Sequence, residues 1–290
     1  MTFETNKFLC EFQANVESFG DLTLDSYLNT NGILGKVNFV SGSIKILKTI
    51  EIDINKAGSG RINGIFVLNV LILTDSINRQ VIKYHENYVY LSSLSLPKAL
   101  SDITSMNEDS VAVASSNSDD IYLINIKTMT LTKTIKVSTI VHGLQYVEGE
   151  FITAYNGTLT WLSATGLQLR DSKNHTDAWF VRSLGKSSYI CADGKHAISH
   201  TKDDRKQFTY SSPTLTHPRW IDVDVEGNIY IVGLSSKNIH QITSEGKHVR
   251  TISTTDFGIA QPCVLRFKPN SAVFLLTSYD TGKVLICKID

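Results

Sequence analysis

Histidines come closest to forming a chemical site in this sequence, because two of the eight, His196 and His200, stand four residues apart. In a helix this spacing lets two imidazoles bind one metal ion, whereas in a strand it only places both side chains on the same face. No carboxylate stands at a spacing that would complete a ligand set. We therefore predict no metal site at this pair.

Nucleophilic and phosphate-binding motifs give no stronger signal. The sequence contains no G-x-S-x-G stretch between a strand and a helix, and no G-x-x-x-x-G-K-[ST] or G-x-G-x-x-G loop. The four cysteines are far apart and form no C-x-x-C pair, which argues against zinc and against a dense disulfide framework; they are Cys10, Cys191, Cys263 and Cys287. We predict no catalytic residue and no cofactor, and we expect reduced, mostly buried thiols.

Composition narrows the class of protein and of partner. A chain of 290 residues with 42% hydrophobic content can bury a large core. Its formal net charge of zero gives no long-range attraction to nucleic acid or to an anionic membrane. The most apolar run, residues 65–73, is about half as long as a membrane-spanning helix requires, and the first residues lack the apolar core of a signal peptide. We expect a cytoplasmic protein with no membrane partner.

The elements that must position any functional side chain form a repeat. Each copy has a β-rich run, a small residue, a polar turn and a second β-rich run, which is the pattern of a hairpin. The copies are residues 71–84, 111–124, 151–162, 188–200, 229–242 and 273–287. Their small residues are Thr74, Ala114, Ala154, Ala192, Gly233 and Thr277, about 38 to 44 residues apart, the length of one propeller blade.

Further short apolar stretches before and after most copies bring the count to four strands per repeat. Helical periodicity is scarce, and a β-sandwich does not explain a four-strand pattern that returns six times. The sequence therefore predicts an all-β, six-bladed β-propeller with four-stranded antiparallel blades. The last copy ends after three strands, so we expect a strand within residues 44–54 to supply the fourth and close the ring.

This reading divides the chain into an extension and a propeller. The extension, residues 1–43, matches no blade and is interpreted as a linker remnant with an extra strand or two, or as strands packed on the propeller. The propeller spans residues 44–290, with 44–54 as the latch strand. Its blades cover about residues 55–96, 97–137, 138–173, 174–215, 216–255 and 256–290.

The fifth repeat carries a family resemblance. Residues 217–231, HPRWIDVDVEGNIYI, resemble the NHL-repeat consensus, in which proline precedes an Ile/Val-Asp strand and an acidic-Gly-Asn turn. Residues 238–242 resemble its third strand, and Pro97 and Pro262 stand at the corresponding start of two other blades. Blades three and four depart from the consensus, since residues 179–182 lack the usual aspartate and residues 191–194 replace the longer turn.

Residues 44–290 as a whole resemble the C-terminal propeller of tripartite-motif (RING/B-box/coiled-coil) proteins. That resemblance implies a propeller that recognises a protein or RNA partner, while a separate RING domain recruits the ubiquitin machinery. This chain has no Cys/His series of a RING or B-box and no heptad coiled coil, so we expect no ligase activity in it.

Some propellers are metal-dependent hydrolases or lyases, which leaves a second, enzymatic alternative. Lactonase-type propellers hold a central Ca²⁺ or Zn²⁺ with carboxylate and amide side chains. The candidates here are Asn63, Asp222 and Asp224. We interpret both aspartates as structural, because residues at these consensus positions usually bond to loop backbone and order the blade. The chain is predicted not to be an enzyme, and no small-molecule substrate is identified.

The loops that lead into the inner strands line one rim of a propeller's channel. Here they carry aromatic and arginine side chains of the kind that dominate interface hot spots; these are Arg61, His142, Trp179, Arg219 and Trp220. Trp220 has a competing role as a plug between blades, and Arg219 as the partner of a neighbouring group. We expect a protein partner on this rim, and the alternative is RNA, which would require a local patch of Lys and Arg.

Overall fold

The computed structural model describes residues 37–54, 61–172, 175 and 178–290. The chain separates after Asn38 into two units, and the fold concerns the unit Phe39–Asp290. Nearly all of the predicted extension lies outside the described residues. No helix in the described part is both long and apolar enough to cross a membrane.

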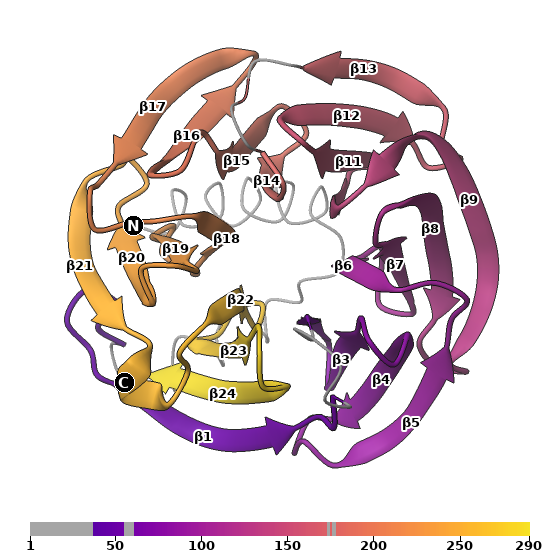
Figure 1. Cartoon of the computed structure of the whole chain (residues 1–290), viewed down its shortest axis with the longest axis horizontal. Coiled ribbons are helices and arrows are strands. Elements are labelled where there is room, and N and C mark those ends of the chain that lie inside the picture. Colours follow the sequence, from indigo (N-terminus) through magenta and orange to yellow (C-terminus); the bar gives the residue numbers. More distant parts are fainter. Residues whose placement is uncertain (1–36, 55–60, 173–174, 176–177) are drawn as a thin grey trace, which may run out of the picture. The chain divides into compact units, whose positions relative to one another are not determined.

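The described residues form six four-stranded sheets arranged around a centre (Figure 1). Blade 1 consists of β2 (Ile62–Val67), β3 (Val70–Asp75), β4 (Gln80–His85) and β5 (Tyr90–Ser95). Blade 2 consists of β6 (Leu100–Ser105), β7 (Ser110–Ser115), β8 (Ser118–Asn125) and β9 (Thr130–Val141). Blade 3 consists of β10 (Gly143–Val147), β11 (Glu150–Tyr155), β12 (Thr158–Ser163) and β13 (Gln168–Ser172).

Blade 4 consists of β14 (Val181–Gly185), β15 (Ser188–Ala192), β16 (Ala197–Lys202) and β17 (Arg205–Ser211). Blade 5 consists of β18 (Pro218–Val223), β19 (Ile229–Gly233), β20 (Asn238–Ile242) and β21 (His248–Ser253), and the 3₁₀ turn η1 (Thr255–Phe257) follows it. Blade 6 consists of β22 (Pro262–Phe267), β23 (Val273–Ser278), β24 (Lys283–Ile289) and β1 (Ile44–Glu51). Neighbouring strands within each blade are antiparallel, so the predicted all-β propeller of six antiparallel blades is confirmed.

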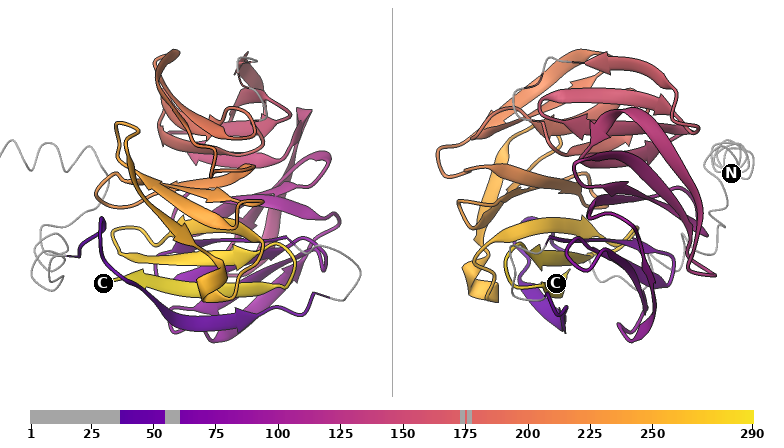
Figure 2. Two further views of the ribbon diagram at one scale, coloured as in Figure 1. Left: turned by 60° about the vertical axis from the view of Figure 1, so that its left-hand side comes forward. Right: turned by 45° about the vertical axis from the view of Figure 1, so that its right-hand side comes forward.

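The predicted closing strand is also confirmed. β1 pairs antiparallel with β24, from Ile44 opposite Ile289 to Glu51 opposite Lys283, and the two lie side by side in all views (Figures 1 and 2). The backbone of the preceding segment is tied to blade 5, because the Arg250 side chain donates to the carbonyl oxygen of Gly42 at 2.6 Å. The ring is thus closed by strand pairing between the two ends of the propeller, which covers the edge of β24 and makes β1 the outer strand of blade 6.

The core lies between blades, because alternate side chains of each strand point toward the neighbouring sheet. Between blades 1 and 2, for example, Ile72 and Val81 pack with Leu100, Ile103 and Val113, all at most 1% exposed. Burying each such aliphatic side chain stabilises the fold by about 1.5 to 3 kcal/mol relative to its exposure. Local polar turns end the strands: the carboxylate of Asp75, the last residue of β3, accepts hydrogen bonds from the backbone amides of Ile77 and Asn78, both at 3.0 Å.

Two inner-strand aspartates tie neighbouring blades together. The Asp102 carboxylate on β6 accepts a hydrogen bond from the Leu144 backbone amide in blade 3 at 2.7 Å. In the same way, the Asp222 carboxylate on β18 accepts one from the Phe267 amide in blade 6 at 2.7 Å. Both side chains are buried. These bonds hold the inner strands in register with one another and so set the geometry of both ends of the channel.

Candidate interaction face

The side on which the inner strands begin collects most of the predicted binding residues. Arg61 directly precedes β2, His142 directly precedes β10, Trp179 lies two residues before β14, and Arg219 is the second residue of β18. The structure brings these four positions together, although they come from blades 1, 3, 4 and 5. We call this surface the N-terminal face, because it lies at the N-terminal ends of the inner strands.

An aromatic cluster forms the floor of the N-terminal face. The His142 ring makes edge contacts with Trp179 and Phe180, with centroid separations of 5.1 and 5.0 Å. Trp179 also contacts Tyr155, which ends β11, at 5.4 Å. Trp179 and Tyr155 are partly exposed, whereas His142 and Phe180 are buried beneath them. Rings in such edge-to-face contacts fix each other's orientation, so the partly exposed rings are held in place by the buried ones.

Two guanidinium groups lie over the same floor. The Cζ atoms of Arg61 and Arg219 are 5.9 and 5.6 Å from the centroid of the Phe180 ring. Arg61 is also 5.9 Å from the Tyr279 ring, and its Nη1 donates a hydrogen bond to Nε2 of His142 at 2.8 Å. Both arginines are partly exposed. The face therefore presents cationic groups whose positions are set by ring contacts, each contributing about 0.5 to 1 kcal/mol.

The imidazole of His142 is held neutral at this position. Its side chain is 5% exposed, and burial lowers its pKa from 6.5 to about 3, with Arg61 and Arg219 lowering it further and a backbone contact with Trp179 opposing the change. In a neutral ring, Nε2 can accept the hydrogen bond that the Arg61 guanidinium donates. His142 therefore positions Arg61 and adds no positive charge to the face.

Trp220 does not reach the surface. Its side chain is 2% exposed, packs against Phe180 at a centroid distance of 4.5 Å and lies under Arg266, whose Cζ is 4.9 Å from the ring. Of the two roles considered for this residue, the geometry favours the plug between blades. The expectation that Trp220 contacts a partner is corrected accordingly, because a side chain this deeply buried cannot touch another molecule without unfolding.

Three residues of the face were missed from the sequence: Tyr155, Phe180 and Tyr279. Phe180 adjoins Trp179, and this aromatic pair just before an inner strand was a usable signal. Tyr155 and Tyr279 instead end or follow the second strand of a blade. Because second strands run antiparallel to inner strands, their ends meet the starts of the inner strands. Applied to the sequence, that rule would have added both tyrosines to the predicted binding residues.

The residues considered for a central metal ion are used by the fold. Asn63 donates to the Asp102 carboxylate at 2.8 Å, and Asp222 pairs with Arg182, with 2.7 Å between Nε and Oδ1. Asp224 orders its own turn by accepting hydrogen bonds from the turn backbone. Within the described ranges, no three His, Cys, Asp or Glu side chains gather closely enough to hold a metal ion.

The two spaced histidines also act separately. His196 Nδ1 bonds to the carbonyl oxygen of Leu215 at 2.8 Å, whereas His200 Nε2 bonds to the Ser188 hydroxyl at 2.9 Å. The pair does not converge on a common point. His200 lies in β16, and His196 directly precedes this strand.

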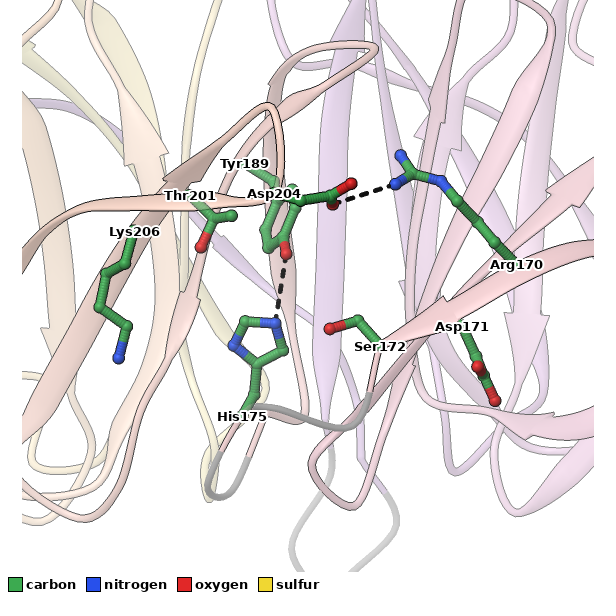
Figure 3. A pocket seen from close by; sticks show the side chains of 8 residues that line it. All are labelled: Arg170, Asp171, Ser172, His175, Tyr189, Thr201, Asp204 and Lys206. Atoms are coloured by element: carbon green, nitrogen blue, oxygen red, sulfur yellow. Dashed lines mark hydrogen bonds and ion pairs between the residues drawn. The ribbon is translucent and has the colours of Figure 1, made fainter.

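A polar cavity of about 560 Å³ lies between β13 of blade 3 and strands β15 to β17 of blade 4 (Figure 3). The His175 ring points at the Tyr189 hydroxyl, 3.3 Å from Nε2. The two basic side chains of its lining are already paired: Arg170 with Asp204 at 3.2 Å, and Lys206 with a carboxylate of the neighbouring turn at 2.7 Å. This cavity therefore offers no unpaired arginine or lysine to a ligand.

A thiol and an imidazole meet beside this cavity. Cys191 Sγ lies 3.3 Å from Nδ1 of His175. Burial raises the pKa of the Cys191 thiol to about 12, so the thiol is protonated at neutral pH. Because the thiolate is the reactive form of cysteine, this pair does not form an activated nucleophile.

Comparison with known proteins supports the fold and nothing finer. No protein-family model matches the sequence, and no curated protein matches it. The β-propeller domain of Cps50 (Swd1) from Myceliophteria thermophila is similar in structure, with a TM-score of 0.66 and 10% sequence identity, over 86% of this chain and 100% of that chain. At this identity the likeness extends to the fold alone. Together with the six four-stranded sheets and the pairing of β1 with β24 that closes their ring, this likeness shows that the chain forms a β-propeller.

Proposed function

We propose that this chain is a non-catalytic interaction platform that recognises another protein through its N-terminal face. The observation that carries the proposal is the convergence of two partly exposed arginines and three partly exposed aromatic rings on one end of the channel. Arginine, tryptophan and tyrosine supply most hot-spot energy in protein interfaces, and here they are positioned in advance by the buried rings below them.

The two guanidinium groups define the chemistry of the partner. Arg61 and Arg219 lie over one ring and remain partly exposed, while His142 between them stays neutral. Guanidinium groups form strong paired hydrogen bonds with carboxylates. We therefore propose that the recognised segment carries an acidic side chain flanked by apolar or aromatic residues, which would pack on Trp179 and Tyr155.

The resemblance to tripartite-motif propellers gives this platform a place in a larger system. In the fifth blade, Asp224 accepts hydrogen bonds from the backbone amides of Glu226 and Asn228 at 2.9 Å each, so its carboxylate orders this turn, which supports the proposed resemblance. We propose that the chain acts as the partner-recognition part of a protein of this kind. The catalytic work would then belong to a different domain.

The test compares two double variants of the purified chain. Arg219→Ala/Trp179→Ala removes a cation and a ring from the N-terminal face. Arg205→Ala/Tyr90→Ala removes the same two kinds of group from exposed positions at the starts of the outer strands β17 and β5, at the other end of the blades. A protein captured from cell extract by the wild-type chain is then purified and titrated by calorimetry. The face variant should weaken its binding by at least about a hundredfold, and the control should leave it within about threefold.

Equal binding of the captured protein to both variants would overturn the choice of face. RNA is tested in parallel by titrating a single-stranded RNA of mixed sequence at two salt concentrations. Tight, strongly salt-dependent RNA binding that the face variant abolishes would overturn the assignment of a protein partner in favour of RNA.

A further inference from the structure

The opposite end of the channel contains a cavity that the N-terminal face does not use. This cavity, of about 240 Å³, lies at the far ends of the inner strands. All six blades contribute to its lining, and its polar side chains include Thr104, Gln145, Arg182, Asp222 and Arg266. Its apolar wall comes from side chains of blades 1, 3 and 6, namely Ile65, Phe66, Tyr146, Phe267 and Pro269. We call it the channel cavity.

Arg266 is the unusual group in this cavity. Its side chain is 7% exposed, yet Nε and Nη2 have no hydrogen-bond partner among the described residues. The nearest carboxylate oxygen to Nη2 is Oδ1 of Asp102 at 3.5 Å, which is beyond the usual length for a charged hydrogen bond. A guanidinium has five N–H groups, and leaving buried ones unpaired is costly. Arg266 therefore lines the cavity with a guanidinium group that has no well-placed acceptor.

The charges around the cavity balance when Asp102 is ionised, but one of the two ion pairs is loose. The Asp222 carboxylate is engaged closely, by Arg182 at 2.7 Å and by a backbone amide. The Asp102 carboxylate lies 3.5 Å from Nη2 of Arg266 and also accepts hydrogen bonds from Asn63 on β2 and from the Leu144 amide on β10. Arg266 therefore lacks a closely placed counter-charge of its own.

The protonation of Asp102 can adjust to an added charge. Burial raises the pKa of this carboxyl to about 6, against the opposing effects of Arg266 and of its hydrogen-bond donors. The group can therefore take up a proton when another negative charge arrives nearby. Proton uptake by Asp102 would release Arg266 from its loose pairing with this carboxylate.

We propose that the channel cavity binds a carboxylate group on a short apolar stem, with Arg266 as the principal donor. The planar guanidinium fork matches the two oxygens of a carboxylate. The aromatic and aliphatic wall suits an alkyl stem of a few carbons, and Gln145 and Thr104 are available to the oxygens. The carboxylate belongs either to a small free acid or to a glutamate side chain of a peptide. The site is independent of the partner proposed for the N-terminal face.

The experiment is an NMR titration of the full chain that follows the Arg266 Nε–H signal and the indole N–H of Trp220, over which Arg266 lies. The probes are butyrate, an acetylated and amidated tripeptide with a central glutamate, and the same tripeptide with glutamine. We expect saturable shifts with a dissociation constant of about millimolar for butyrate or for the glutamate tripeptide, since a small ligand can gain only limited energy. Whichever of the two binds identifies the source of the carboxylate.

Three variants separate the site from general effects. Arg266→Gln should weaken binding at least about tenfold. Because removing this charge can destabilise the fold, Ser105→Trp serves as a second variant: it leaves both guanidinium groups intact and fills the mouth of the cavity from an exposed lining position. Arg170→Gln, which removes an arginine from the outer strand of blade 3, is the matched control and should bind as wild type.

Saturable binding that both cavity variants weaken and the control preserves supports the proposal. No saturable shift with butyrate and with the glutamate tripeptide would show a cavity filled by water alone and would overturn it. Equal binding by folded Ser105→Trp would overturn it as well, and so would equal binding of the glutamine tripeptide.

Discussion

Replacing His142 with glutamine should remove a pH-dependent part of the protein's stability. In the unfolded chain the imidazole takes up a proton near its ordinary pKa of 6.5, whereas in the folded chain burial and two neighbouring arginines lower that pKa to about 3. The folded state therefore binds fewer protons between these values. This contribution to stability is fully present above pH 6.5 and is lost as the pH falls toward 3.

The magnitude follows from the two pKa values. Between pH 7 and pH 4.5 the unfolded imidazole becomes almost fully protonated while the folded one stays neutral, which corresponds to a loss of about 2.5 kcal/mol from the free energy of unfolding. Glutamine retains an acceptor for Arg61 but does not titrate. The stability difference between wild type and His142→Gln should therefore shrink by about 2.5 kcal/mol over this interval.

Urea denaturation at pH 7 and pH 4.5, followed by tryptophan fluorescence and by circular dichroism, measures this difference. The buried Asp102 acts in the opposite direction, since its pKa is raised to about 6 and the fold is stabilised as the pH falls through that value. It is present in both proteins, so its effect cancels in the comparison.

His85→Gln, at an exposed position, is the control. Its stability difference from wild type should change by less than about 0.5 kcal/mol between the two pH values. A His142→Gln difference that is equal at both pH values would refute a buried neutral imidazole.

Three further predictions concern burial. Trp220→Ala should lower the free energy of unfolding by about 3 to 5 kcal/mol, whereas Trp179→Ala, at a partly exposed position, should lower it by less than half as much. Urea unfolding of both variants measures the two losses. Gly143→Ala should cost about 1 to 3 kcal/mol in the same assay, because a Cβ there would lie 2.6 Å from the Trp179 carbonyl oxygen and 2.8 Å from the Phe180 Cα. The Cys191 thiol, with its pKa raised to about 12, should react with iodoacetamide at pH 8 at least about a hundredfold more slowly in the folded chain than in urea, as measured by peptide mass spectrometry.

The blade architecture could be predicted because its signals are local. Alternating β-branched and aromatic residues, small residues at a fixed position and Asx turns such as that of Asp75 all act within a dozen residues. Because the same weak signals occur in all six copies, the repeat makes the prediction stronger than any single copy would. The closing strand followed from counting, since a last blade with three strands requires a fourth from elsewhere in the chain.

Part of the N-terminal face was also accessible from the sequence. In a propeller every inner strand begins on the same side, so any residue just before an inner strand belongs to one rim. That rule placed Arg61, His142, Trp179 and Arg219 together without knowledge of their contacts. It could not show that His142 is buried and neutral, because burial depends on rings contributed by a neighbouring blade.

What only the tertiary structure decided is the depth of each side chain and the pairing of charges across the channel. Trp220 and Arg219 are adjacent in sequence, yet one is buried between blades and the other is partly exposed, because the β18–β19 pairing has an irregularity that leaves Arg219 without an opposite residue. Arg182, Asp222 and Arg266 come from three different blades, and no local pattern relates them. Periodicity determines which strands form and in what order, whereas the register between blades determines which side chains meet and which donors remain unpaired.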